Sequence, residues 1–333
     1  MADGGPGRQG ATHGALPAQA ARPRLTVGRV LRALGRLRLG LATLGKTGNS
    51  GVARKPSGPR NADAPVRAWP GLRRLSGLCL LAALGAAAPA GAQPLGHDVY
   101  FLGEIHDNPA HHRTQADWVA ALGPKALVFE MLTPDQAGRV TPALIADAEQ
   151  LGAVLGWADS GWPDFAMYHP IFAAAPDAAY LGVAVPRDAA RAAMSQGVAA
   201  AFGGQAARFG LDRPLPDDEQ ARREALQLRA HCDALPGEML PGMVAIQRLR
   251  DARLAERALE ALDRYGAPVA VITGNGHARR DWGAPAALAL AAPDLQIFAL
   301  GQGEAASGPP PGPFDEIAIG PDIDRGDPCA AFR

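Results

Sequence analysis

The chain has 333 residues, with 33 Lys and Arg, 33 Asp and Glu, no net charge, and a hydrophobic content of 47%. The balance hides a split, because residues 1–92 carry 14 basic and two acidic residues, whereas residues 93–333 carry 19 basic and 31 acidic ones. The acidic main part argues against nucleic acid as a partner, since phosphate binding needs clustered Lys and Arg.

Residues 1–66 are rich in Arg, Gly, Pro and Ala and contain no capped helix or strand pattern. They are expected either to be disordered or not to belong to the natural protein, as the result of a gene-calling artefact. The artefact hypothesis puts the true start near Val66, at a non-ATG codon. The alternative is a basic amphipathic helix over residues 25–44 that lies on a membrane surface. N-terminal sequencing of the natural product distinguishes the two.

A secretory signal peptide is predicted over residues 67–92. Three arginines precede an apolar stretch at 78–90 that is too short to span a bilayer, and Ala90-Gly91-Ala92 forms a small-x-small cleavage signal. Cleavage would leave a mature chain at 93–333, which suits one α/β domain. A lipoprotein attached through Cys79 is the weaker alternative, because a leucine rather than a small residue precedes that cysteine. The sequence therefore predicts a periplasmic or exported protein.

The mature chain alternates strand-like and helix-like segments. This alternation predicts an α/β fold with a mixed, largely parallel sheet flanked by helices. A mostly helical stretch at 187–264 is expected to form an insertion. The predicted strands are 97–105, 126–131, 180–185, 269–273, 295–300 and 314–319, and the predicted helices outside the insertion are 109–122, 133–155 and 164–175.

Two strand-like runs end in the same way, at a glycine followed three residues later by a histidine. The first run ends in Gly103-Glu104-Ile105-His106 and the second in Gly274-Asn275-Gly276-His277. Ligands of parallel sheets bind outside the carboxyl ends of the strands. Folding is therefore expected to bring the two turns into a single polar site.

Further candidates surround the first turn. Glu104 and His106 are two apart and share one face of a strand, and Glu130 directly follows a buried apolar run. His111 and His112 open the next helix, and only one of them is expected to face the site. Imidazole and carboxylate together suit general acid–base chemistry by Glu104, His106, Glu130 and His277, or a divalent metal held by Glu104, His106 and His277.

An aromatic-rich stretch at 157–172 is expected to line a pocket for a flat apolar ligand, with Trp162 in its wall and with Tyr168 and His169 as the candidate ligands to iron. Core packing is the simpler alternative. Arg187 and Arg250 are candidates for binding the carboxylates of such a ligand. The pair Cys232 and Cys329 either forms a disulfide or remains as two free thiols.

The chain resembles the ChaN family in the segments 101–112, 128–130 and 274–277, and in His231-Cys232 and the Gln-x-x-Arg-Asp pattern of 247–251. ChaN proteins are exported bacterial haem-binding proteins, often lipoproteins. Their wider superfamily is similar in layout to erythromycin esterases and to Tiki and TraB proteins, some of which are hydrolases. The resemblance implies an α/β domain with Glu104, His106, Glu130 and His277 at one site. It also implies haem bound through a tyrosine, together with a homodimer.

The favoured expectation is an exported haem-binding protein in haem or iron uptake, with an outer-membrane uptake system as its partner. Tyr168, His111, His112, Trp162, Arg187 and Arg250 are the residues expected to contact haem. The alternative is a metal-dependent or His/Glu hydrolase of the esterase or peptidase kind. A third hypothesis is a binding scaffold whose catalytic residues are relics.

Overall fold

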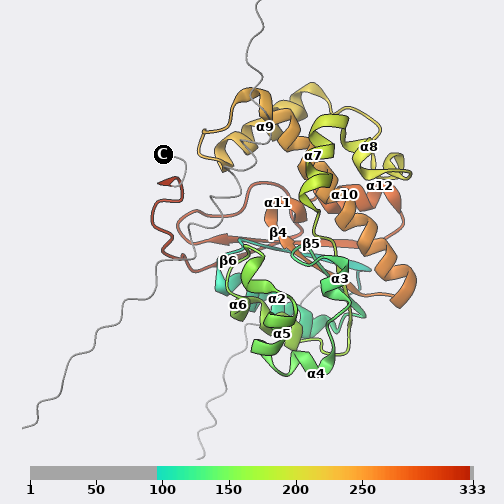
Figure 1. Cartoon of the computed structure of the whole chain (residues 1–333), viewed down its shortest axis with the longest axis vertical. Helices are drawn as coiled ribbons and strands as arrows, with labels where there is room; N and C mark the ends of the chain where they lie inside the picture. The colour runs from blue at the N-terminus through green and yellow to red at the C-terminus, as the bar shows by residue number, and fades with distance from the viewer. Residues whose placement is uncertain (1–95, 331–333) are drawn as a thin grey trace, which may run out of the picture. The chain divides into compact units, whose positions relative to one another are not determined.

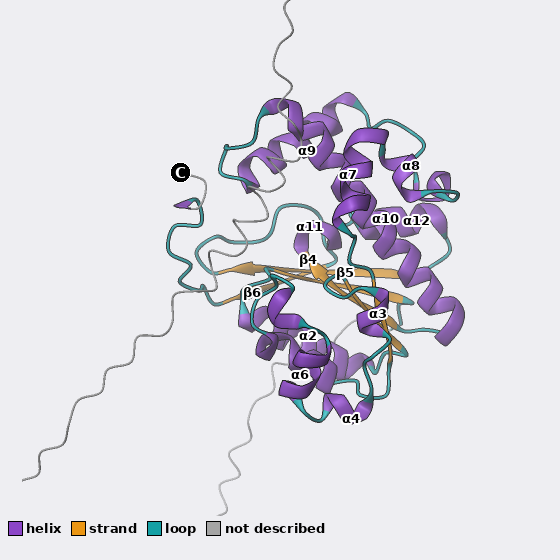
Figure 2. Ribbon diagram, viewed as in Figure 1, coloured by secondary structure: helices purple, strands orange, loops and turns teal. Residues whose placement is uncertain are grey.

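The computed structural model describes residues 96–330, so the predicted extension and signal peptide (1–92) lie outside the described residues. The described part is an α/β fold in which one six-stranded sheet lies between two layers of helices (Figure 1, Figure 2). The strand order is β3-β2-β4-β1-β5-β6, and all neighbouring strands are parallel. The predicted α/β class is confirmed, with a sheet that is parallel throughout rather than mixed. The strands are β1 (Val99–Glu104), β2 (Ala126–Phe129), β3 (Ala179–Gly182), β4 (Val269–Gly274), β5 (Ile297–Glu304) and β6 (Glu316–Gly320).

The two helical layers follow the order of the chain, as the colour gradient of Figure 1 shows. One layer contains α2 (Pro109–Leu122), α3 (Pro134–Ala137), α4 (Pro142–Ile145), α5 (Ala148–Val154) and α6 (Phe165–Ala173). The other contains α7 (Arg187–Gln196), α8 (Val198–Phe202), α9 (Asp217–Ala230), α10 (Leu240–Tyr265), α11 (Asn275–Ala278) and α12 (Ala284–Ala291). None of the described helices combines the length and the apolar content that a membrane crossing needs.

The strands β1, β2, β4 and β5 are buried on both faces, which explains why they read as nearly continuous apolar runs. Successive side chains of a strand point to opposite faces. Phe101 and Val271 accordingly pack into the core that α10 and α12 cover. Tyr100 and Leu102 pack into the core beneath α2 and α6.

Local capping signals set the helix boundaries. Helix α2 begins after Asn108, whose side chain accepts a hydrogen bond from the backbone N–H of Ala110, and it ends at Gly123 in the left-handed region. The single helix predicted over 133–155 is wrong. This segment forms three helices, α3, α4 and α5, because the side chains of Thr141 and Asp147 cap the N-termini of α4 and α5.

The strand register brings the two glycine–histidine turns together. Strand β4 lies between β1 and β2, and Glu104 at the end of β1 pairs in register with Gly274 at the end of β4. The backbone N–H of Glu130, just after β2, donates to the carbonyl of Ile272. Segments that are far apart in the sequence therefore end side by side at one edge of the sheet.

Candidate functional site

The first half of the site surrounds the buried carboxylate of Glu104. Its Oε1 lies 2.7 Å from Nδ1 of His106 and accepts a hydrogen bond of 2.9 Å from the hydroxyl of Tyr168. Its Oε2 lies 3.2 Å from Nδ1 of His112, which is also buried. Three elements, the end of β1, α2 and α6, therefore fix this carboxylate from different directions.

The electrostatics of this half favour a charged Glu104 and a neutral Tyr168. Burial opposes the charge on Glu104, but the hydrogen bond with His106 and the adjacent imidazole of His112 outweigh burial and lower the pKa of the carboxyl. Burial and the nearby Glu104 charge both raise the pKa of the Tyr168 phenol. The Tyr168 side chain is therefore a buried hydrogen-bond donor rather than a phenolate.

The second half of the site surrounds Glu130 on the opposite face of the sheet edge. Its Oε2 accepts hydrogen bonds from the hydroxyl of Thr273 at 2.7 Å and from the backbone N–H of Gly274 at 3.0 Å. Its Oε1 lies 3.7 Å from Nε2 of His277. The other ring nitrogen of His277, Nδ1, lies 2.6 Å from Oδ1 of Asp251 on α10.

The pKa values of the two carboxyl groups in this half, those of Glu130 and Asp251, shift in opposite directions. Burial opposes ionisation of Glu130, but the charges of His277 and His106 and the two donated hydrogen bonds lower its pKa to about 2. Burial likewise opposes the charged form of His277, but Glu130 and Asp251 outweigh burial and raise the imidazole pKa. Burial raises the pKa of Asp251. The Asp251–His277 pair therefore favours retention of its proton.

The two halves meet at Gly274. A Cβ atom at this position would lie 2.9 Å from Nε2 of His106, so the His106 ring occupies the space that a side chain there would take. The same glycine donates its N–H to Glu130. His106, Glu130 and His277 therefore belong to one continuous polar site, as the paired turns predict.

His106 is the member of this site that reaches the surface. Its side chain is 35% exposed, whereas that of Glu104 is fully buried. The ring lies edge-on against the half-buried indole of Trp162, at a centroid distance of 4.9 Å. The predicted pair His106 and Trp162 therefore forms the accessible part of the site.

The other predicted residues occupy different positions. His111 is buried, accepts a hydrogen bond from the N–H of Ile105 at Nδ1, and lies 3.1 Å from the carbonyl of Gly303 through Nε2. Burial lowers its pKa. Because both ring nitrogens are engaged in the interior, His111 packs as a structural residue beside the site. His112, with Nε2 at 2.8 Å from the carbonyl of His106, is the histidine of this pair that faces Glu104.

The two candidate arginines differ in their relation to the site. Arg250 is half-buried on α10, one residue before Asp251, and its charge acts on the imidazole of His277. Arg187 is exposed at the first position of α7. Of these two arginines, Arg250 is the one whose charge acts on the site.

The predicted metal ligands do not form a metal site in the described part of the chain. Within residues 96–330, no group of three or more His, Cys, Asp or Glu side chains is arranged to hold a metal ion. The reason is local: Glu104 is engaged by His106, His112 and Tyr168, and His277 by Asp251 and Glu130. Among Glu104, His106, Glu130 and His277, the His106 side chain is the most exposed.

Two residues of the site neighbourhood were not among the predicted site residues, Asp251 and Arg325. Asp251 is the last residue of the Gln-x-x-Arg-Asp pattern, and in the structure it is buried among apolar residues of α10. Arg325 donates hydrogen bonds to Asp107 and Glu304. It comes from a tail without regular pattern, so no periodicity marked it.

Comparison with known proteins places the chain in a family. A family model described as haem-binding uptake, Tiki superfamily, ChaN matches residues 92–288. The chain therefore belongs to the ChaN family of the Tiki superfamily, and its main part is a haem-binding uptake domain of that family. No curated protein matches the chain.

Solved structures with a similar fold include that of "Cofacial heme binding to ChaN of Campylobacter jejuni", with a TM-score of 0.45, 17% identity, and coverage of 62% of this chain and 81% of that one. The type III effector HopBA1 matches with a TM-score of 0.33 and 12% identity, over 68% of this chain and 88% of the effector. A succinoglycan biosynthesis protein matches with a TM-score of 0.31 and 11% identity, over 62% and 66%.

Proposed function

We propose that the chain is an exported haem-binding protein that takes part in haem or iron handling, and that His106 is its iron ligand. Family membership supports haem as the ligand. The observation that carries the choice of His106 is its orientation. Nδ1 faces the buried carboxylate of Glu104 at 2.7 Å while the ring remains 35% exposed.

This orientation suits metal ligation. A carboxylate that accepts the Nδ1 proton of a histidine fixes the tautomer and leaves the lone pair on Nε2 for a metal. Nε2 of His106 packs against Gly274, because a Cβ at that position would lie 2.9 Å from it. The indole of Trp162 offers an apolar surface next to the ring, and Arg250 offers a cation for a propionate.

Tyr168, which the sequence favoured as the iron ligand, is replaced in this role for a physical reason. Its side chain is completely buried, its hydroxyl donates to Glu104, and its pKa is raised. A tyrosine binds ferric iron as the phenolate, and this environment disfavours the phenolate. Tyr168 therefore supports His106 indirectly, through Glu104.

A haemin titration followed by absorbance tests the proposal on the mature chain, residues 93–333. The wild type should shift the haemin spectrum in a saturable way. His106→Ala should lose that shift, and Tyr168→Phe should keep it. A wild-type spectrum equal to that of free haemin would overturn the proposed function, and an unchanged titration of His106→Ala would overturn the choice of ligand.

Export and partners form part of the proposal. The predicted signal peptide at 67–92 and the Cys232–Cys329 disulfide support an oxidising compartment, since disulfides persist there. A homodimer and an outer-membrane uptake system are the partners that the ChaN resemblance implies. Light scattering of the mature chain with and without haemin tests the dimer, and fractionation of the natural host tests the location.

A hydrolase is the second candidate, and the buried Asp251–His277 pair favours it. A histidine oriented by one carboxylate beside a second carboxylate is an arrangement used in acid–base catalysis. Ester and peptide substrates should be screened with and without divalent metals. Turnover that disappears in His106→Ala would support this candidate, and no turnover under any condition would remove it.

A further inference from the structure

The C-terminal tail, residues 321–330, crosses the loop that presents His106. We call residues 105–108 the site loop. Asn108 donates its side-chain N–H to the carbonyl of Pro321 at 2.9 Å. Arg325 donates to both carboxylate oxygens of Asp107, at 2.9 and 2.8 Å. Since Asp107 directly follows His106, the tail holds the residue next to the exposed imidazole.

The same arginine ties the tail to the sheet. Arg325 donates to Oε1 and Oε2 of Glu304, at the end of β5, at 2.6 and 2.7 Å. Oε1 of Glu304 also accepts from the Asn108 side chain at 2.6 Å. The hydrogen bonds from Arg325 are the main reason why the pKa of the Glu304 carboxyl is lowered. The site loop and the tail are thus joined at one buried carboxylate.

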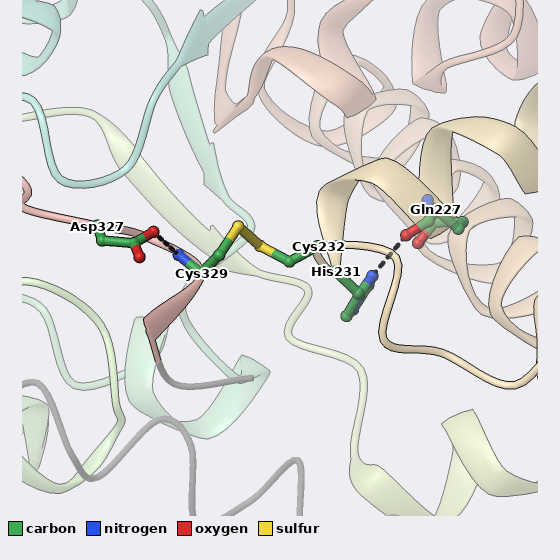
Figure 3. The surroundings of a disulfide bond; sticks show 5 residues. All are labelled: Gln227, His231, Cys232, Asp327 and Cys329. Carbon is green, nitrogen blue, oxygen red and sulfur yellow. Dashed lines mark hydrogen bonds between the residues drawn. A yellow bond between two sulfur atoms is a disulfide. The ribbon is translucent and has the colours of Figure 1, made fainter. Parts of the chain in front are cut away.

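A disulfide anchors the far end of the tail (Figure 3). Cys329, four residues beyond Arg325, is bonded to Cys232, with a Cα–Cα distance of 5.6 Å and a sequence separation of 97. Cys232 lies just after α9, on a different element from the site loop. Both cysteines are half-buried, so a small or flexible thiol can reach the bond.

The disulfide also fixes a strained turn. Cys232 and Asp233 have φ values of 55° and 57°, the left-handed region that residues with a Cβ adopt at a cost. The covalent bond links the tail end to the segment that follows α9 in the helical layer.

We propose that the Cys232–Cys329 disulfide is a redox-controlled latch for the site loop, opened by a dithiol protein of the thioredoxin-like chemical class. A thiolate of the dithiol attacks one sulfur, the S–S bond breaks, and a mixed disulfide forms. The second thiol of the dithiol then displaces the remaining cysteine. Two electrons pass to this chain, which gains two thiols, and the dithiol becomes a disulfide.

Opening the latch should act on the site through Arg325. While the bond is closed, the tail is tethered at both ends, and the local concentration of Arg325 at Asp107 is high. Reduction relaxes the turn at Cys232 and frees the tail end, so Arg325 leaves Asp107 more often. The site loop, with His106, then becomes more mobile; a consequence for haem affinity rests on the proposed function.

Hydrogen exchange followed by mass spectrometry tests the latch without haem. The mature chain is compared in the oxidised state and after reduction with dithiothreitol. Exchange in peptides that cover residues 103–112 and 321–330 should accelerate about tenfold on reduction, while a peptide over the central strand β4 should not change. Equal exchange of residues 103–112 in the two states would overturn the proposal.

Two variants separate the latch from a general loss of structure. A Cys232→Ser, Cys329→Ser double variant should exchange like the reduced wild type and ignore dithiothreitol. Oxidised Arg325→Gln should accelerate exchange at 103–112 with the disulfide intact, whereas the control Arg222→Gln, which removes an exposed pair with Asp218, should not. If Arg325→Gln leaves residues 103–112 unchanged, the latch does not act through Arg325 and the proposal fails. A haemin titration of the oxidised wild type tests the proposed function separately.

Discussion

Oδ1 of Asp251 lies 2.6 Å from Nδ1 of His277, and this contact joins the long helix α10 to the end of strand β4. Both side chains are buried, and the opposite ring nitrogen of His277 faces Glu130. The helix thus supplies the charge that orients an imidazole on the sheet. In the sequence, 26 residues separate these two groups, so only the packing of α10 on the sheet creates the pair.

Asp251→Asn should therefore lower the pKa of His277, because the amide keeps a hydrogen-bond acceptor but loses the charge. The imidazole signal of His277, followed by NMR over a pH series, measures the change. The free energy of unfolding should fall by about 3 kcal/mol, since one partner of a buried ion pair is removed. Asp218→Asn on the exposed face of α9 is the control. An unchanged titration of His277 would contradict the assigned pairing.

The opposite pKa shifts of Glu130 and His277 should limit stability on both sides of neutral pH. The pKa of Glu130 falls from 4.5 to about 2 on folding, so its contribution is present above pH 4.5 and disappears as the pH falls towards 2. That contribution is about 3 kcal/mol by linkage. The pKa of His277 rises from 6.5, so its contribution is complete below that value and disappears as the pH rises through the folded-state pKa.

Glu130→Gln should reduce the slope of the acid limb, because the glutamine does not titrate between pH 4.5 and 2. Urea unfolding at a series of pH values gives the free energy needed for the comparison. The alkaline limb should also move to lower pH, since His277 loses a neighbouring negative charge. Acid limbs of equal slope in the variant and the wild type would contradict the low pKa of Glu130.

Gly274→Ala should displace the His106 ring. The backbone at Gly274 has a φ of −68°, which alanine adopts without strain, but the new Cβ would lie 2.9 Å from Nε2 of His106. We expect a loss of about 1–3 kcal/mol in stability from overpacking, together with weaker haemin binding. Gly276→Ala is a matched control in the same turn, because a Cβ there meets no atom within 4 Å. Equal haemin affinity of the two variants would contradict the position of the ring.

Glu104→Gln should weaken haemin binding by about 10–100-fold, as expected when the residue that orients a metal-binding histidine is replaced. The amide keeps an oxygen for Tyr168 and His106 but loses the negative charge beside His106 and His112, so stability should fall too. Haemin titrations at a temperature well below unfolding separate the two effects. Glu316→Gln, on the exposed edge strand β6, should bind haemin like the wild type.

Local signals in the sequence predicted those parts of the fold that local interactions determine. Helix α2 has the predicted bounds because Asn108, Pro109 and Gly123 fix its ends. The split of 133–155 into three helices was missed, because the caps at Thr141 and Asp147 compete with a periodic apolar pattern. Helix α12, an alanine-rich segment without a polar face, was also missed.

In the site as well, residues marked by a local sequence pattern were predictable, and residues placed by tertiary packing were not. The two turns that carry His106 and His277 were recognisable because each follows a strand-like run. Asp251 and Arg325 were not recognisable, since they reach the site through tertiary packing. The burial of Tyr168 under Trp157 and His112 could not be predicted from an aromatic-rich stretch alone.

The position of β4 between β1 and β2 has a consequence for how the chain reaches its native state. The strands β1 and β2 do not touch, so the first half of the domain cannot form a continuous sheet until residue 269 is available. Pairings across so long a separation form slowly, because loop closure precedes any gain from contact. The polar centre is therefore assembled among the last steps of folding, and a polypeptide interrupted before β4 would have two exposed strand edges in place of a site.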